Sequence, residues 1–140
     1  MNQYLAEEIR SHREHLGLTK TEAAKRAGMG IQALNTIESD PLSSSMEHIL
    51  DYMTALGLEL IVVKINDPDI RITVKKRLFR KHLESLHEGI DRRTAASMMD
   101  MTWSNVTHIE THSGCFPRFE SYLKYLKTFG YYIIVKSKNE

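Results

Sequence analysis

The feature that most constrains the fold is an internal repeat, because residues 18–38 align with residues 90–110 at a constant offset of 72 positions. The matching pairs are Leu18 with Ile90, Ala23 with Ala95, Ala24 with Ala96, Met29 with Met101, Leu34 with Val106, Ile37 with Ile109 and Glu38 with Glu110. After one inserted residue the match continues, with Met46, Leu50, Met53 and Gly57 on Phe119, Leu123, Leu126 and Gly130. The sequence therefore predicts two diverged copies of one unit, over residues 1–66 and 67–140.

Each copy reads as four to five short helices followed by one strand. Leu5, Ile9 and Leu16 predict the apolar face of a first helix, and helices over 19–27, 31–38 and 46–56 lead to a strand over 58–65. The second copy predicts a helix over 74–87, two helices over 92–110, a loop over 113–117, a helix over 119–129 and a strand over 131–136, after a linker at 66–69. The expected class is mainly α, and the two strands should pair antiparallel within the chain because an isolated strand exposes unpaired backbone.

The centre of each copy has the spacing of two helices joined by a tight turn. A small residue allows the helices to cross closely, and Ala24 and Ala96 supply it. Four positions later the turn needs a residue that tolerates a positive φ, and Gly28 or Asp100 stands there. Apolar residues then follow on the inner face of the next helix. This spacing is typical of a helix-turn-helix, and it occurs twice.

Residues 18–24, 28–30 and 37–38 together resemble the XRE-type (Cro/phage repressor-like) helix-turn-helix family. The strand after each copy resembles the C-terminal strand of HipB-type antitoxins, which helps to form their dimers. The second copy departs from the family pattern, with Asp100 at the turn glycine and Ser85 where the first copy has Arg13. The resemblance implies a sequence-specific regulator that binds double-stranded DNA, most often a repressor at an operator. It also implies a buried Arg13–Glu38 pair, and Glu110 must then be paired otherwise or exposed.

The resemblance places two recognition helices at about 31–38 and 103–110, with their first exposed residues in the major groove. It also places phosphate contacts at the start of the preceding helix in each copy. The expected DNA-binding residues are Lys20, Thr21, Ile31, Gln32, Asn35 and Thr36 in the first copy, and Arg92, Arg93, Thr102, Trp103, Ser104, Thr107 and His108 in the second.

The chemistry of these side chains suits base reading. Gln32 and Asn35 can pair bidentately with adenine, and Ile31 can contact a thymine methyl group. Helix N-termini favour phosphate through their dipole and free N–H groups. Two interpretations of Trp103 stay open: its ring contacts DNA, or it packs against the other unit of the chain.

Charge leaves a second function open. The net charge is +1, but residues 1–66 carry −3 and residues 67–140 carry +4. The basic second copy favours DNA. The alternative is a protein-interaction or antitoxin-like module, in which the second copy binds a protein partner or mediates homodimerisation.

Other functions find little support in the sequence. No paired carboxylates, catalytic triad or glycine-rich phosphate loop is evident, so we expect no enzyme, cofactor or small-molecule substrate. His108, His112 and Cys115 have possible zinc spacing, but a fourth ligand is not evident and we expect no metal. A single cysteine forms no intrachain disulfide, and no stretch of 18 apolar residues predicts a membrane span. With no signal-like start, the expected location is the cytoplasm.

Overall fold

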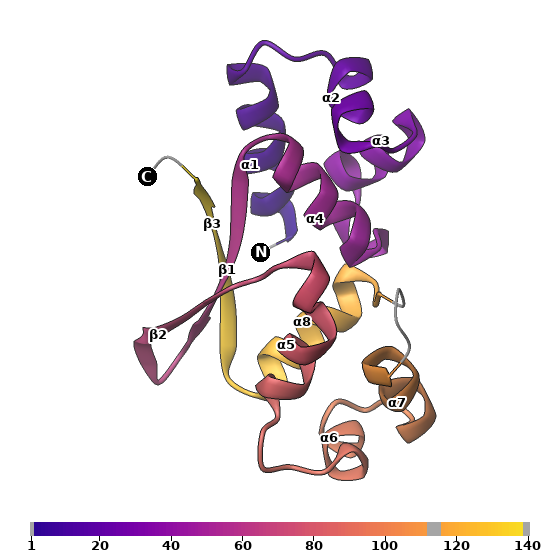
Figure 1. Cartoon of the computed structure of the whole chain (residues 1–140), viewed down its shortest axis with the longest axis vertical. Coiled ribbons are helices and arrows are strands. Elements are labelled where there is room, and N and C mark those ends of the chain that lie inside the picture. Colours follow the sequence, from indigo (N-terminus) through magenta and orange to yellow (C-terminus); the bar gives the residue numbers. More distant parts are fainter. Residues whose placement is uncertain (1, 112–115, 139–140) are drawn as a thin grey trace.

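The computed structural model describes residues 2–111 and 116–138, which form a mainly helical fold with a small antiparallel sheet (Figure 1). The first elements are α1 (Asn2–His15), α2 (Lys20–Ala27), α3 (Ile31–Ser39), η1 (Pro41–Ser43), α4 (Met46–Ala55) and β1 (Leu58–Lys64). They are followed by β2 (Asp67–Thr73), η2 (Lys76–Leu78), α5 (Phe79–Leu86), α6 (Arg92–Met98), α7 (Trp103–Thr111), α8 (Phe119–Thr128) and β3 (Tyr131–Ser137).

Local sequence signals fix the ends of the helices that matter for function. Thr19 caps α2 through a capping box with Glu22, and Asp91 caps α6 by accepting a bond from the Thr94 N–H group. Helix α2 ends at Gly28, whose φ of 69° is left-handed, and Asp100 takes the same conformation after α6 with a φ of 55°. The predicted turn positions are therefore confirmed.

The sheet has the strand order β2-β1-β3, with both pairs antiparallel. The pairing of β1 with β3 confirms the expected intrachain pair, and its register places Ile61 opposite Ile134. Figure 1 shows the helices on the other side of the molecule from the β1–β2 turn.

Two expectations about the connecting segments were wrong. The linker expected at 66–69 largely belongs to strand β2, which runs from Asp67 to Thr73, and the helix expected from residue 74 begins only at Phe79, after η2. Pro68 and the neighbouring aspartates resemble a linker, but the β-branched Ile70 and Ile72 alternate with polar residues as a strand requires. The Val74 N–H group then donates to the Leu60 carbonyl over 2.9 Å, which holds this residue at the sheet instead of in a helix.

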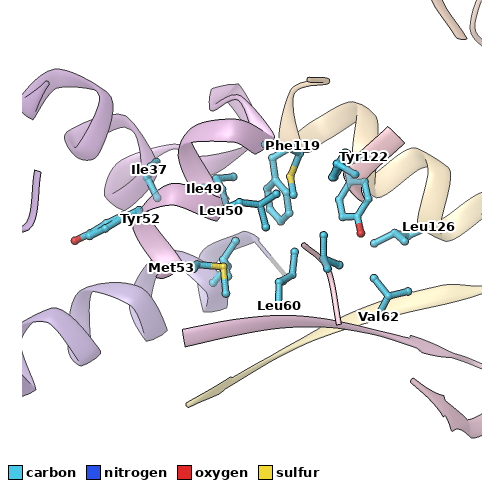
Figure 2. Close-up of a cluster of buried hydrophobic side chains, with 14 of the residues drawn as sticks. Ile37, Ile49, Leu50, Tyr52, Met53, Leu60, Val62, Phe119, Tyr122 and Leu126 are labelled. Carbon is cyan, nitrogen blue, oxygen red and sulfur yellow. The ribbon is translucent and has the colours of Figure 1, made fainter. Parts of the chain in front are cut away.

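The core lies between one face of the sheet and helices α4 and α8 (Figure 2). Figure 2 shows side chains from α4 and α8 reaching toward one another above β1, with Ile49, Leu50 and Met53 on α4, Phe119, Tyr122 and Leu126 on α8, and Leu60 and Val62 on β1. Leu16 was expected on the apolar face of α1, but this is wrong: it is 45% exposed because α1 ends at His15.

The starts of α4 and α8 are joined by reciprocal backbone bonds. The Met46 N–H group donates to the Pro117 carbonyl over 2.9 Å, and the Phe119 N–H group donates to the Ser44 carbonyl over 2.8 Å. Between these bonds, Ser45 and Arg118 form an isolated antiparallel bridge. The two helices therefore begin at one shared point, on their far side from the sheet.

Candidate nucleic-acid interface

The turn between α2 and α3 holds the first candidate recognition helix on a buried base. Beneath the turn, the Met29 N–H group donates to the Ala24 carbonyl over 3.0 Å. Leu34 and Ile37 point inward from α3 and are fully buried, as the spacing predicted. The opposite face of α3 is therefore turned outward.

That outer face presents the predicted base-reading residues. Ile31 is 45% exposed, and Gln32 and Asn35 are also exposed. Thr36 is half-buried, and its hydroxyl donates to the Gln32 carbonyl over 3.0 Å, so its proton is already used within the helix. Gln32 and Asn35, with Ile31 beside them, are the chemically best-placed side chains on α3 for contacts with base edges.

The start of α2 carries the predicted phosphate contacts. Lys20 and Thr21 are exposed in the first turn, next to N–H groups that have no partner inside the helix. A cation and free donors at a helix N-terminus suit a phosphate oxygen.

Helix α7 presents a different set of side chains. Trp103 is 47% exposed, and the Arg93 guanidinium lies 5.2 Å from its ring centroid. Trp103 is therefore not buried, which does not fit its packing against the other unit. Ser104 and His108 are exposed and Thr107 is half-buried, while the Thr102 hydroxyl accepts the Asn105 N–H group as a helix cap. An indole covered by a guanidinium is a contact surface that α3 does not have.

Arg92 is engaged within the protein. Its guanidinium donates to Glu84 over 3.2 Å, and a second nitrogen lies 3.9 Å from a Glu110 oxygen. Its side chain is 34% exposed. A phosphate at this helix end would compete with Glu84 for Arg92, which the sequence did not reveal.

A buried ion pair anchors α3 from below. The Arg13 guanidinium donates two hydrogen bonds to Glu38, over 2.8 and 3.1 Å, and a third to the Leu18 carbonyl over 2.9 Å. The Tyr52 hydroxyl donates to the same carboxylate. The bond to Glu38 raises the pKa of Arg13, so the guanidinium stays charged, and burial raises the pKa of Tyr52, so its hydroxyl keeps the proton that it donates to Glu38. The predicted Arg13–Glu38 pair is confirmed.

A related cluster anchors α7, with a histidine in place of the arginine. His87 bonds to Glu110 over 2.6 Å and to the Ile90 carbonyl over 3.1 Å, and the Tyr125 hydroxyl donates to Glu110 over 3.2 Å. Burial is the largest single influence on the pKa of His87 and lowers it, but the hydrogen bond and charge of Glu110 together with backbone hydrogen bonds, including that to Ile90, outweigh burial, so the pKa is raised. The prediction that Glu110 is paired otherwise is confirmed. Sequence reasoning missed the two tyrosines, although Tyr52 and Tyr125 stand 73 positions apart, which is the offset of the predicted repeat in this region.

The two candidate helices lie toward opposite ends of the molecule. Figure 1 shows α3 near one end and α7 near the other, both on the side away from the strands. The expected spacing of successive major grooves, about 34 Å, stays a prediction for these two helices. His112 and Cys115, weighed above as zinc ligands with His108, lie outside the described residues.

A helix-turn-helix family model matches residues 9–63, the segment that runs from α1 to β1. This segment is therefore similar to helix-turn-helix domains, which agrees with the resemblance seen in the sequence. No curated protein and no solved structure matched the chain. None of the described helices is long and apolar enough to cross a membrane.

Proposed function

We propose that one chain acts as a covalently fused pair of helix-turn-helix units that binds duplex DNA and represses transcription from an asymmetric operator. The observation that carries this proposal is the register of β1 with β3. Ile61 faces Ile134, and these residues are 73 positions apart, which makes them equivalent in the repeat. Strands from two subunits would meet in this way at a two-fold axis.

A second contact supports the same axis. Ser45 and Arg118 also stand 73 positions apart, and they bridge each other between reciprocal backbone bonds. An axis through this bridge and through the Ile61–Ile134 pair relates α2–α3 to α6–α7. The two recognition helices then face the same side, as the reading of two successive major grooves requires.

Backbone conformation at the chain reversals gives further support. Positive φ angles occur at Gly17, Gly28 and Gly57, and again at the equivalent Gly89, Asp100 and Gly130. At these three pairs of equivalent positions the chain therefore reverses in the same backbone conformation, although the side chains have diverged. A diverged pair favours an operator with two unlike half-sites, because α3 and α7 present different groups to the bases.

Repression is the role that this geometry supports best. A protein that occupies two successive major grooves excludes other proteins from the same stretch of DNA. We expect it to act in the cytoplasm, without a cofactor.

A second candidate function rests on the surface around α6 and α7. Met98, at the end of α6, is 50% exposed, and Trp103, at the start of α7, is exposed with the Arg93 guanidinium over its ring, while Arg92 bonds to Glu84. Aromatic, methionine and arginine side chains are enriched at protein interfaces. The α5–α8 half could therefore bind a protein partner while α1–α4 binds DNA.

A selection from random duplexes, followed by mobility-shift titration in increasing salt, separates the two functions. The proposal expects an asymmetric site that spans two major grooves, with log affinity falling by about 0.9 per neutralised phosphate for each log unit of salt. A site that spans one groove, unaffected by Trp103→Ala, would support the protein-partner function of the second half. No binding to any duplex by the folded protein would overturn both.

A further inference from the structure

The sheet has two outer edges, which are built differently. On the β2 side, Asp67, Pro68, Asp69 and Arg71 line the edge, and the register shifts between Val63 and Lys64. Charges, proline and irregular pairing are the usual means by which an edge strand avoids a partner. On the β3 side the strand begins with five consecutive uncharged residues, Tyr131–Tyr132–Ile133–Ile134–Val135, and contains no proline.

The hydrogen bonds that flank β3 show which of its backbone groups face outward. The Ile65 N–H group donates to the Gly130 carbonyl over 2.8 Å, and the Lys138 N–H group donates to the Gly57 carbonyl over 2.9 Å. Backbone groups of alternate residues point to opposite edges of an antiparallel strand. The even-numbered residues from 130 to 138 therefore face β1, and Tyr131, Ile133 and Val135 face away from it.

These outward groups have no partner in the part of the chain that the structure describes. β3 pairs with β1 alone, and no other backbone bond reaches Tyr131, Ile133 or Val135. Three N–H donors and three carbonyl acceptors therefore line one open edge. Their side chains are half-buried against the core, so the strand is held in place while its edge is open.

We propose that this edge pairs with the same edge of a second copy of this chain, so that two copies share one continuous six-stranded sheet. An antiparallel pair centred on Ile133 places each Ile133 opposite the other and each Tyr131 opposite the other copy's Val135. The intervening pairs join Tyr132 with Ile134, and Lys136 meets Gly130. Every cross-strand pair is apolar or free of like charge, which is the pairing that stabilises a sheet.

The self-complementary register is what selects a second copy over an unrelated peptide. When two copies of β3 are related by a two-fold axis through Ile133, the outward N–H and carbonyl groups of each strand lie opposite those of the other. Up to six backbone hydrogen bonds then form. The β2 edge offers charged residues and a proline instead, so growth stops at two copies. The proposal concerns assembly only and does not depend on DNA binding.

Sedimentation of the full chain without DNA, from micromolar to millimolar concentration, tests the proposal. We expect a reversible monomer–dimer equilibrium. Ile133→Pro and Val135→Pro each remove one outward N–H group per copy and should weaken dimerisation about tenfold or more. Arg71→Pro is the matched control, because it removes an outward N–H group from the β2 edge and should leave the dimer unchanged.

Amide hydrogen exchange provides a test without any substitution. The amides of Tyr131, Ile133 and Val135 should gain protection as concentration rises, while those of Tyr132 and Ile134 are protected throughout by β1. Retained protection of Ile134 in the proline variants shows that the sheet is still folded. A chain that stays monomeric with concentration-independent exchange at Ile133 overturns the proposal, and so does a dimer that only Arg71→Pro disrupts.

Discussion

The His87 imidazole lies 2.6 Å from the Glu110 carboxylate, beneath α7, where the Arg13 guanidinium lies beneath α3 at 2.8 Å from Glu38. Both carboxylates are buried and each accepts a tyrosine hydroxyl from the following helix. The two candidate recognition helices are thus anchored by similar clusters with different cations. Arginine keeps its charge at any accessible pH, whereas histidine titrates near neutrality.

Arg13→Ala should lower the free energy of unfolding by about 3–5 kcal/mol, because it leaves the Glu38 charge buried without its partner. Arg10→Ala is the matched control, since Arg10 is exposed on the same helix. Chemical denaturation of both variants measures the difference. Equal midpoints for Arg13→Ala and Arg10→Ala would contradict the role of the buried pair.

Stability should depend on His87 at alkaline pH. The folded-state pKa of His87 is raised by Glu110, so its contribution is complete below the unfolded value near 6.5 and is lost as pH rises through the folded pKa. Its charged partner is Glu110, whose carboxylate also accepts the Tyr125 hydroxyl and lies 3.9 Å from Arg92. His87→Arg should flatten this decline, because arginine stays charged. Thermal unfolding between pH 6 and 9 checks this prediction. Identical slopes of melting temperature against pH in the unmodified chain and in His87→Arg would contradict the role given to His87.

His82 should affect the pH dependence of stability in the opposite direction to His87, with stability lost toward acidic pH. Burial lowers its pKa to about 4, and its ring bonds to the Tyr122 hydroxyl over 2.7 Å. As pH drops, His82 takes up a proton in the unfolded chain before it does so in the folded chain. The free energy of unfolding should therefore fall between pH about 6.5 and 4, by up to roughly 3 kcal/mol. His82→Gln keeps a polar group beside Tyr122 without a titrating ring. Denaturation curves at pH 7 and pH 4.5 should differ less in this variant than in the unmodified chain.

Glu84→Gln should strengthen DNA binding. Neutral glutamine releases Arg92 from its 3.2 Å ion pair and makes the guanidinium available to a phosphate. The log–log salt slope should steepen by about 0.9, the value for one added phosphate contact. Glu88→Gln makes the same charge change at an exposed position of the neighbouring turn. If Glu84→Gln and Glu88→Gln change DNA affinity by the same amount, the effect comes from the change in net charge, and release of Arg92 does not contribute.

Gln32→Ala should weaken binding by about 1–3 kcal/mol and relax base choice in one half-site only. Lys20→Ala should weaken binding to all sequences alike, since a phosphate contact carries no base information. Selection from random duplexes with each variant measures both effects. Loss of specificity in both half-sites after Gln32→Ala would mean that two chains bind through one kind of helix.

The repeat predicted most helices of this fold because each signal was local: Thr19 and Asp91 cap helices, and Gly28 and Asp100 reverse the chain. Strand β2 was missed because its first residues resemble a linker and only pairing with β1 orders them. The buried Arg13–Glu38 pair followed from the family resemblance.

In the second half of the chain, a histidine at a shifted position takes the structural place that Arg13 has in the first half, and the sequence could not predict this. Position 85 is a serine, and His87 reaches Glu110 from two residues further along. Arg92 was predicted to be available for phosphate, because the sequence does not show that Glu84 lies within its reach. Contacts between segments that differ in the two copies depend on three-dimensional placement, which a repeat does not specify.

The pairing of β1 with β3 inside one chain affects how DNA occupancy depends on protein concentration. In a repressor assembled from two separate subunits, dilution takes the subunits apart, so operator occupancy varies with the square of subunit concentration when the protein is scarce. Here the strands are covalently linked and stay paired on dilution. Under the proposed function a single chain brings both candidate reading surfaces to its site, and occupancy at low expression should rise in direct proportion to the number of chains in the cell.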